Sequence, residues 1–168
     1  MDRVDHPHQE HRVHPVTCAV ITVSDTRTLQ TDQSGALICE LLGSAGHSLH
    51  VRDLLPDEPE IIRERVRALC DTASCHAILL TGGTGLAARD TTFEAVASLL
   101  EKKLDGFGEL FRTLSYPEIG AAAMLSRAVA GVRRRTAIFS MPGSVAGVRL
   151  AMDRLILPQL SHVAWLLS

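Results

Sequence analysis

The sequence predicts an α/β domain of three layers (α/β/α), in which helices cover both faces of a mostly parallel central sheet. Two short segments, residues 16–23 and 77–80, are apolar on both parities, which is typical of strands buried on both faces. Segments with apolar residues three and four positions apart follow these strands and predict amphipathic helices. This alternation of strands and helices indicates an α/β fold with a parallel sheet.

The composition indicates one folded domain preceded by a short extension. A chain of 168 residues with 46% hydrophobic content can bury one substantial core, which we place in residues 16–168. Residues 1–15 are polar and rich in histidine, without helical or strand periodicity. The histidines in this segment are His6, His8, His11 and His14. We predict a disordered extension, and opportunistic binding of a transition metal is the alternative.

Charge and composition argue against several classes of function. The net charge is −2, the isoelectric point is near 6.4 and aromatic residues make up only 4%, so we expect no nucleic-acid partner. The basic run 133–135 is interpreted as a solvated turn. No apolar run has the length of a membrane span and no signal peptide opens the chain, so we expect a cytoplasmic protein with no membrane partner. The cysteines lack C-x-x-C spacing, and we expect free thiols.

The first strand, residues 16–23, ends in the polar pair Ser24-Asp25. In an open α/β sheet the carboxyl ends of the parallel strands line the ligand crevice, so this pair is expected at the binding edge. Asp32 or Thr31 can cap the helix that follows.

A second strand is predicted at residues 50–55, and the turn after it contains Asp57. Asp57 can cap the next helix, and Glu60 three residues later would complete a capping box. Because Asp57 also follows a strand, it falls on the same edge of the sheet as Ser24 and Asp25. Both roles of Asp57, as a cap and as a functional acid, stay open at this point.

The strand at residues 77–80 runs into a glycine-rich loop, residues 81–85. Glycines permit positive φ and let successive N–H groups converge on one anion, so the loop predicts a phosphate site. A helix is expected from Thr91, where Thr91-x-x-Glu94 matches a capping box. Asp90 then lies outside the cap, where its carboxylate can hold a metal ion. No lysine follows the last glycine, so the loop is not a standard P-loop and a cation has to come from elsewhere.

The glycine loop has two other interpretations. It can be an ordinary tight turn between a strand and a helix. The spacing Gly83-x-Gly85-x-x-Ala88 also fits a relaxed dinucleotide fingerprint. That fingerprint belongs on the first strand of a domain and needs an acid at the end of the next strand, so its position here argues against a nicotinamide site.

In the second half, residues 107–114 have helical spacing, which the proline-containing run 115–118 is expected to end. A turn is expected at residues 101–105 and a short alanine-rich helix at residues 119–127. Two apolar segments that flank the arginine run, residues 128–132 and 136–140, predict a hairpin.

The last strand ends at the turn Met141-Pro142-Gly143-Ser144. Ser144 can cap the final helix, and Pro158 is expected to kink it.

The loops that follow the strands therefore gather at one edge of the predicted sheet. They carry Ser24, Asp25, Asp57, residues 81–85, Asp90 and residues 142–144. This set combines anion donors with carboxylates and lacks the Cys/His or Ser/His/Asp sets of covalent catalysis. It suits metal-assisted phosphoryl or nucleotidyl transfer, in which the protein positions and neutralises charged groups.

At these residues the sequence resembles the molybdopterin adenylyltransferase family, which includes MogA, MoaB and the G domain of gephyrin, and MoaB in particular. The motifs occur in order and cover nearly everything after residue 15. They are Ser24-Asp25, Leu55-Pro56-Asp57-Glu58, Ser74-Cys75-His76, residues 81–85 with Arg89-Asp90, Gly106-Phe107-Gly108-Glu109, Leu125-Ser126-Arg127 and Met141-Pro142-Gly143-Ser144.

The resemblance implies a MogA/MoaB-like fold and a role in molybdenum cofactor biosynthesis. Its reaction is adenylyl transfer from Mg-ATP to molybdopterin, which gives adenylyl-molybdopterin and pyrophosphate. Asp57 and Asp90 match the catalytic acids and are assigned to Mg²⁺ and phosphate positioning. Phosphate and molybdopterin contacts are implied for Thr81, Gly82, Gly83, Thr84, Gly85, Ser24, Asp25, Pro142, Gly143 and Ser144, with Glu109, Ser115 and Ser126 as further residues for the pterin or its phosphate.

The resemblance also implies a homotrimer or a homohexamer, and handover of the product to a molybdenum insertase. Two alternatives to an active enzyme remain: a catalytically silent, molybdopterin-binding MoaB protein, and an unrelated small nucleotide-binding domain. The presence of both Asp57 and Asp90 favours the active enzyme, and the ordered series of motifs argues against an unrelated domain.

Overall fold

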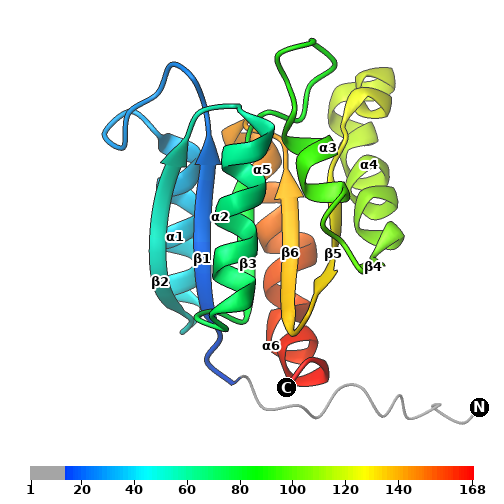
Figure 1. Cartoon of the computed structure of the whole chain (residues 1–168). Helices are drawn as coiled ribbons and strands as arrows, with labels where there is room; N and C mark the ends of the chain where they lie inside the picture. The colour runs from blue at the N-terminus through cyan, green and yellow to red at the C-terminus, as the bar shows by residue number, and fades with distance from the viewer. Residues whose placement is uncertain (1–13) are drawn as a thin grey trace, which may run out of the picture.

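The computed structural model describes residues 14–168, which form a six-stranded sheet with helices on both faces (Figure 1). The strands are β1 (Thr17–Val23), β2 (Ser48–Leu55), β3 (Ala77–Thr81), β4 (Lys102–Lys103), β5 (Val129–Arg133) and β6 (Thr136–Met141). Their order in the sheet is β2-β1-β3-β6-β5-β4. The first four strands in this order run parallel, and β5 runs antiparallel to both of its neighbours. The predicted α/β class with a mostly parallel sheet is confirmed.

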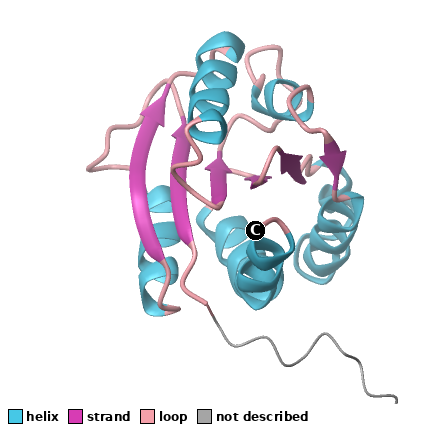
Figure 2. Cartoon of the chain, turned by 60° about the horizontal axis from the view of Figure 1, so that its bottom comes forward, coloured by secondary structure: helices cyan, strands magenta, loops and turns pink. Residues whose placement is uncertain are grey.

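The helices divide between the two faces of the sheet (Figure 2). They are α1 (Gln33–Ser44), α2 (Pro59–Asp71), α3 (Thr92–Ala97), α4 (Asp105–Ile119), the 3₁₀ segment η1 (Gly120–Leu125), α5 (Val145–Ala151), the π-helical segment η2 (Met152–Ile156) and α6 (Leu157–Leu166). One core packs α1, α4, α5 and α6 on the sheet, and the other packs α2 and α3.

Strand β3 shows why helices have to cover both faces of the sheet. Leu79 faces the core of α1 and α5, whereas its neighbours Ile78 and Leu80 face the core of α2 and α3, and all three are fully buried. Each such side chain stabilises the fold by about 1.5–3 kcal/mol relative to an exposed position. A strand that is apolar on both parities therefore has to lie between two helical layers.

The predicted side-chain caps are confirmed at two helix starts and wrong at two. Asp32 caps α1 by accepting from the Gly35 N–H, and Ser144 caps α5 by accepting from the Gly147 N–H, as predicted. The capping box at Asp57 is wrong, because α2 begins after Glu58 with no side-chain cap. The helix α3 begins after Thr91, as expected, but the capping box there is wrong, since the Thr91 hydroxyl forms no cap bond. The side chains of Asp57 and Thr91 bind each other instead.

The segment around α4 corrects two further expectations. The predicted helix end at residues 115–118 is wrong, because α4 continues through Pro117 to Ile119. Pro117 lies in the last turn, where it removes only one backbone hydrogen bond, and Gly120 with φ of 58° ends the helix. The expected turn at 101–105 contains the short edge strand β4, which pairs with β5.

The remaining predictions concern the hairpin, the last helix and the cysteines. The β5–β6 hairpin is confirmed. The final helix is interrupted by the π-helical segment η2 directly before Leu157 and Pro158. All four cysteines are free, as expected, and burial raises the pKa of the Cys18 thiol to about 12. Within residues 14–168, no helix is both long and apolar enough to span a membrane. The predicted extension lies almost wholly outside the described residues.

Candidate active site

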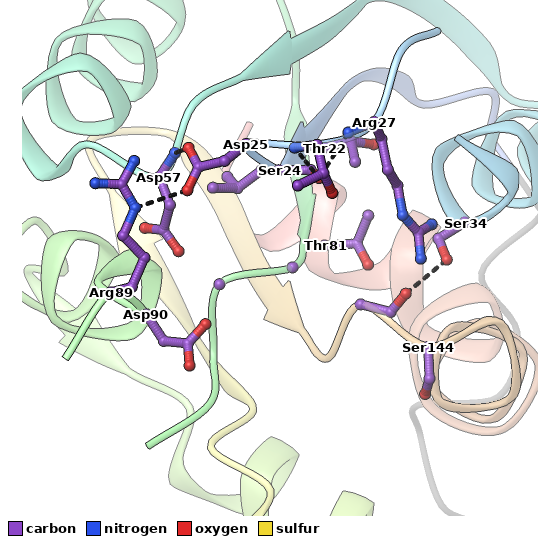
Figure 3. A pocket seen from close by; sticks show the side chains of 15 residues that line it. Thr22, Ser24, Asp25, Arg27, Ser34, Asp57, Thr81, Arg89, Asp90 and Ser144 are labelled. Carbon is purple, nitrogen blue, oxygen red and sulfur yellow. Dashed lines mark hydrogen bonds and ion pairs between the residues drawn. The ribbon is translucent and has the colours of Figure 1, made fainter. Parts of the chain in front are cut away.

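A pocket of about 410 Å³ lies at the carboxyl ends of the parallel strands (Figure 3). It is formed where β1, β3 and β6 end and where the loop after β2 returns to α2. The lining residues predicted from the sequence are Ser24, Asp25, Asp57, Thr81, Gly82, Gly83, Asp90, Gly143 and Ser144. The lining residues that were not assigned to the site are Thr22, Val23, Thr26, Arg27, Ser34 and Arg89. Segments far apart in the chain thus meet at the edge that the topology predicted.

The other predicted site residues lie outside this pocket. Ser115, Ser126 and Pro142 line a smaller cavity of about 100 Å³, which shares Ser144 with the main pocket. Glu109 is exposed on α4 and lines neither cavity. Thr84 is buried within the glycine loop. The loop at Pro142–Ser144 therefore forms a wall between two neighbouring cavities.

The glycines of the loop are required by close packing as well as by backbone conformation. Gly82 and Gly83 have φ values of 100° and 64°, which other residues rarely adopt. A Cβ at Gly82 would lie 2.2 Å from the Val23 carbonyl oxygen. The Gly82 N–H donates to the Met141 carbonyl, whereas the Gly83 N–H has no partner among the described residues. Of these two N–H groups, the one at Gly83 is free to meet an anion.

Asp57 lies behind the glycine loop and is only 6% exposed. Its Oδ1 accepts from the Thr91 N–H at 3.1 Å and from the Thr91 hydroxyl at 2.7 Å. Its Oδ2 forms no hydrogen bond within the described part of the chain and would lie 2.3 Å from a Cβ at Gly83. The Thr92 hydroxyl oxygen would lie 2.1 Å from the same Cβ, and it is buried without a hydrogen-bond partner among residues 14–168. One carboxylate oxygen and one hydroxyl oxygen are thus left unsatisfied beside Gly83.

Asp90 follows the glycine loop, in the same connection from β3 to α3. Its Oδ2 accepts from the Ala87 N–H at 3.1 Å and would lie 2.4 Å from a Cβ at Gly85. Asp57 and Asp90 therefore pack against two glycines of one loop, and both line the same pocket. Among residues 14–168 no group of three or more His, Cys, Asp or Glu side chains could hold a metal ion. A cation between these two acids would need further oxygen ligands from a bound substrate or from water.

The rim of the pocket carries an ion pair and a further arginine. Asp25 accepts from the Arg89 guanidinium at 2.7 Å and from the Asp57 N–H at 3.1 Å. These two bonds hold the pKa of the Asp25 carboxyl below its usual range. The Arg27 side chain forms no hydrogen bond or ion pair in the described structure, and it points toward the Ser34 side of the pocket (Figure 3). Arg27 and Arg89 therefore provide the positive charge that residues 81–85 of the glycine loop lack.

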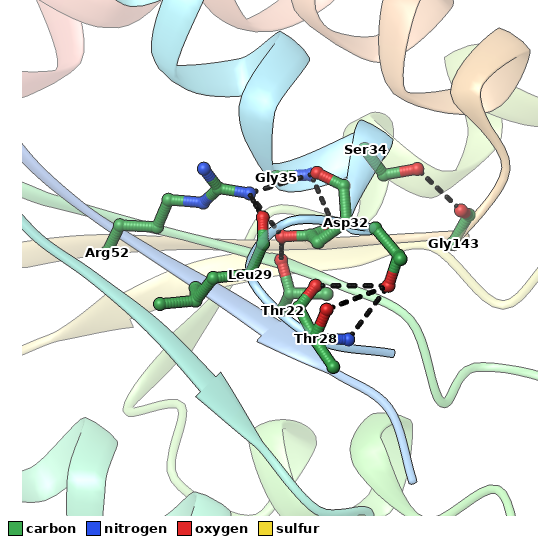
Figure 4. A network of polar contacts seen from close by, with 9 residues as sticks. Thr22, Thr28, Leu29, Asp32, Ser34, Gly35, Arg52 and Gly143 are labelled. Atoms are coloured by element: carbon green, nitrogen blue, oxygen red, sulfur yellow. Dashed lines mark hydrogen bonds and ion pairs between the residues drawn. The ribbon is translucent and has the colours of Figure 1, made fainter. Parts of the chain in front are cut away.

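A network of hydrogen bonds around the buried Asp32 supports the loop between β1 and α1 (Figure 4). The carboxylate of Asp32 accepts from Thr22, from Gly35 and from Arg52, all within 2.9 Å. Burial raises the pKa of Asp32, but these three hydrogen bonds more than offset burial and hold the pKa below its usual range. Ser34, two residues later, donates to the Gly143 carbonyl at 2.8 Å and so links α1 to the loop after β6.

Sequence reasoning missed Ser34 and the partner of Asp32, because both act through contacts between distant segments. Asp32 and Arg52 are 20 residues apart, and Ser34 and Gly143 are 109 residues apart. The predicted N-cap at Asp32 was the only feature of the local sequence that indicated a structural role in this region.

Known proteins share both the sequence and the fold of this chain. Residues 19–162 match the model of a family described as a probable molybdopterin binding domain. The chain is 52% identical over 157 residues to molybdenum cofactor biosynthesis protein B of Halalkalibacterium halodurans, covering 93% of this chain and 92% of that protein. A crystal structure of a molybdenum cofactor biosynthesis protein B has a TM-score of 0.90 at 48% identity, covering 94% of this chain and 98% of that one.

A further solved structure is the molybdopterin biosynthesis enzyme MoaB of Thermus thermophilus. It has a TM-score of 0.80 at 37% identity and covers 90% of this chain and 96% of its own. These similarities extend over nearly the whole chain, including every strand that contributes to the pocket. The chain therefore belongs to the MoaB family of molybdenum cofactor biosynthesis proteins.

Proposed function

We propose that this protein is an active molybdopterin adenylyltransferase. In this reaction an oxygen of the terminal phosphate of molybdopterin attacks the α-phosphorus of ATP, the bond from that phosphorus to the bridging oxygen breaks, and pyrophosphate leaves. The observation that carries the proposal is that Asp57 and Asp90 pack against two glycines of one loop and line one pocket. A protein that only binds molybdopterin has no need for two acids at that position.

The two acids also fit the magnesium ion that the reaction needs. Asp57 presents an oxygen without a hydrogen-bond partner, beside the unpaired hydroxyl oxygen of Thr92. Mg²⁺ prefers oxygen ligands and is held in nucleotide enzymes by one or two carboxylates together with substrate phosphates. Asp57 and Asp90 would hold it, and when bound it would neutralise phosphate charge and act as a Lewis acid.

The side chains of the pocket can bind and orient the two phosphorylated substrates. The free N–H of Gly83 is a donor for a phosphate oxygen. Arg27 supplies a guanidinium that has no partner in the described part of the chain, and its planar donors suit a phosphate group. Arg89 is held on the rim by Asp25, where its charge also favours anions. The pocket thus combines donors for anions with two acids for a cation, as phosphoryl chemistry requires.

We assign the two cavities to the two substrates as part of the same proposal. The larger pocket, with both acids and the arginines, would hold the reacting phosphates. The smaller cavity next to Ser144 is lined partly by Phe111, Ile119 and Leu150 and would receive part of the pterin. Ser115 and Ser126, which the resemblance assigned to the pterin, line that smaller cavity.

We further propose that the protein is a homo-oligomer, a trimer or a hexamer. Large apolar side chains are exposed together on α4 and η1, which is unusual for a surface that faces only water. They are Leu110, Tyr116, Ile119, Met124 and Leu125. Light scattering coupled to gel filtration tests this, and a monomeric mass at micromolar concentration would contradict it.

The enzymatic proposal is tested by mixing the protein with molybdopterin and Mg-ATP and measuring pyrophosphate. We expect release well above a control without protein and loss of release when Mg²⁺ is chelated. Binding of molybdopterin without any release would overturn the proposal and leave a silent binding protein. Failure to bind molybdopterin would contradict both functions.

A further inference from the structure

Arg127 reaches the glycine loop from outside the pocket. It follows η1, and its guanidinium donates to backbone carbonyls at both ends of the loop 82–91, which joins β3 to α3. Nε donates to the Thr84 carbonyl at 2.9 Å, and Nη2 donates to the carbonyls of Gly85 and, at 3.5 Å, of Asp90. Arg127 is not among the residues that line the pocket. Its contacts with the loop therefore lie outside the pocket lining.

Two side chains of α3 hold this guanidinium in place. The carboxylate of Glu94 accepts from both terminal nitrogens of Arg127, and this interaction lowers the pKa of Glu94. The Arg127 Cζ lies 4.9 Å from the centroid of the Phe93 ring, in the geometry of a cation–π contact. Only 21% of the Arg127 side chain is exposed. Arg127 is therefore a fixed group that connects the start of α3 to the loop before it.

The chain neighbours of Asp90 are held by other contacts, because Arg89 pairs with Asp25 and Glu58 and Thr91 donates to Asp57. The Asp90 N–H donates to the Ala87 carbonyl, and the Asp90 carboxylate accepts from the Ala87 N–H. These bonds close a small turn over residues 87–90, and Leu86 directly before it is 67% exposed. The bonds from Arg127 to Gly85 and to Asp90 hold the backbone carbonyls of this segment, which the side-chain contacts of Arg89 and Thr91 leave free to move.

We propose that Arg127 is a positioning residue that acts through Asp90. By holding the carbonyls of the loop 82–91, it fixes the direction in which the Asp90 carboxylate faces the pocket. This inference rests on the proposed adenylyl transfer, in which the placement of Asp90 decides the rate. The planar guanidinium makes several bonds in fixed directions, and a lysine at this position keeps the charge but cannot reproduce them.

The test compares Arg127→Lys with a matched control, Arg63→Lys. Arg63 is 23% exposed, pairs with Glu60 and donates to the Ser98 hydroxyl, but it lies on α2 and does not contact the loop. We expect Arg127→Lys to lower kcat for pyrophosphate release by about tenfold to a hundredfold, the scale of a small misplacement of a catalytic group. The Kd for molybdopterin should be nearly unchanged, and Arg63→Lys should match the wild type.

Two further measurements separate positioning from general stability. In the double variant Arg127→Lys/Asp90→Asn, the rate should equal that of Asp90→Asn alone, because Arg127 acts through Asp90. Hydrogen exchange in peptides that cover residues 82–91 should be faster in Arg127→Lys, with β3 unchanged. A wild-type kcat in Arg127→Lys, a fully multiplicative loss in the double variant, or unchanged exchange of the loop would each overturn the inference. If the wild type releases no pyrophosphate, the proposed function fails, and the exchange measurement still decides whether Arg127 holds the loop.

Discussion

Replacement of Asp32 by alanine is predicted to destabilise the fold by about 3 kcal/mol through the loss of a buried charge partner. Asp32 is 1% exposed, and its carboxylate accepts from Thr22 at 2.7 Å and from Gly35 and Arg52 at 2.9 Å each (Figure 4). Alanine removes the cap of α1 and leaves the Arg52 guanidinium without its carboxylate.

The magnitude follows from these two losses. Removal of an N-cap side chain costs about 1 kcal/mol. Breaking a buried ion pair by removing one partner costs about 3–5 kcal/mol. The second cost is smaller here, because 23% of the Arg52 side chain is exposed and water can hydrate part of the abandoned charge. A total of about 3 kcal/mol is therefore expected from the structure.

The same carboxylate makes stability depend on pH with a definite sign. The pKa of Asp32 is lower in the folded protein than its ordinary value of about 3.9. The contribution of this carboxylate to the free energy of unfolding is therefore fully present when the pH is above the ordinary pKa. It is lost as the pH falls through the lowered pKa of the folded state. In Asp32→Ala this acid-dependent part of the free energy of unfolding should be absent.

Urea denaturation followed by circular dichroism measures the free energy of unfolding of both variants. The matched control is Asp53→Ala, because Asp53 pairs with Arg65 at 2.6 Å but both side chains are partly exposed, at 22% and 35%. Exposed pairs contribute about 0–1 kcal/mol, so the control should lose less than that. A loss in Asp32→Ala no greater than in Asp53→Ala would refute the assignment of Asp32 as a buried support of the site.

Three further variants test the pocket itself. Asp90→Asn should lower turnover at least about a hundredfold while the melting temperature and the molybdopterin Kd stay close to wild type, and unfolding of this variant would indicate a structural role instead. Arg27→Gln should raise the KM for ATP with an unchanged melting temperature, and an unaltered KM would show that Arg27 does not meet the phosphates. Gly82→Ala should destabilise the fold by about 1–3 kcal/mol in urea, because φ is 100° and its Cβ would clash with the Val23 carbonyl.

The sequence predicted the sheet well, because the buried strands carry a local signal. Residues 16–23 and 77–80 are apolar on both parities, and that pattern requires helices on both faces whatever the rest of the chain does. The same topology placed Ser24, Asp57 and residues 81–83 at one edge, and the structure brings them together in one pocket.

The errors arose where a local motif competed with a contact from another segment. Asp57 has the sequence of an N-cap, but Thr91, which is 34 residues away, occupies its carboxylate. Glu94 has the spacing of a capping-box residue, but it pairs with Arg127. Proline usually ends a helix, but Pro117 lies in the last turn of α4, where the missing N–H removes only one hydrogen bond and destabilises the helix little. Such choices depend on the tertiary partner, which propensity and spacing do not contain.

The central claim is that the acids around the glycine loop promote transfer of the α-phosphate of ATP to molybdopterin. The most direct measurement uses ATP labelled at the α-phosphate, with Mg²⁺ and molybdopterin, and follows the label by chromatography. We predict that the label appears on molybdopterin in step with pyrophosphate, and that Asp57→Asn and Asp90→Asn each slow its transfer at least about a hundredfold. Molybdopterin that binds but stays unlabelled, or labelling that survives the loss of both acids, would contradict the account.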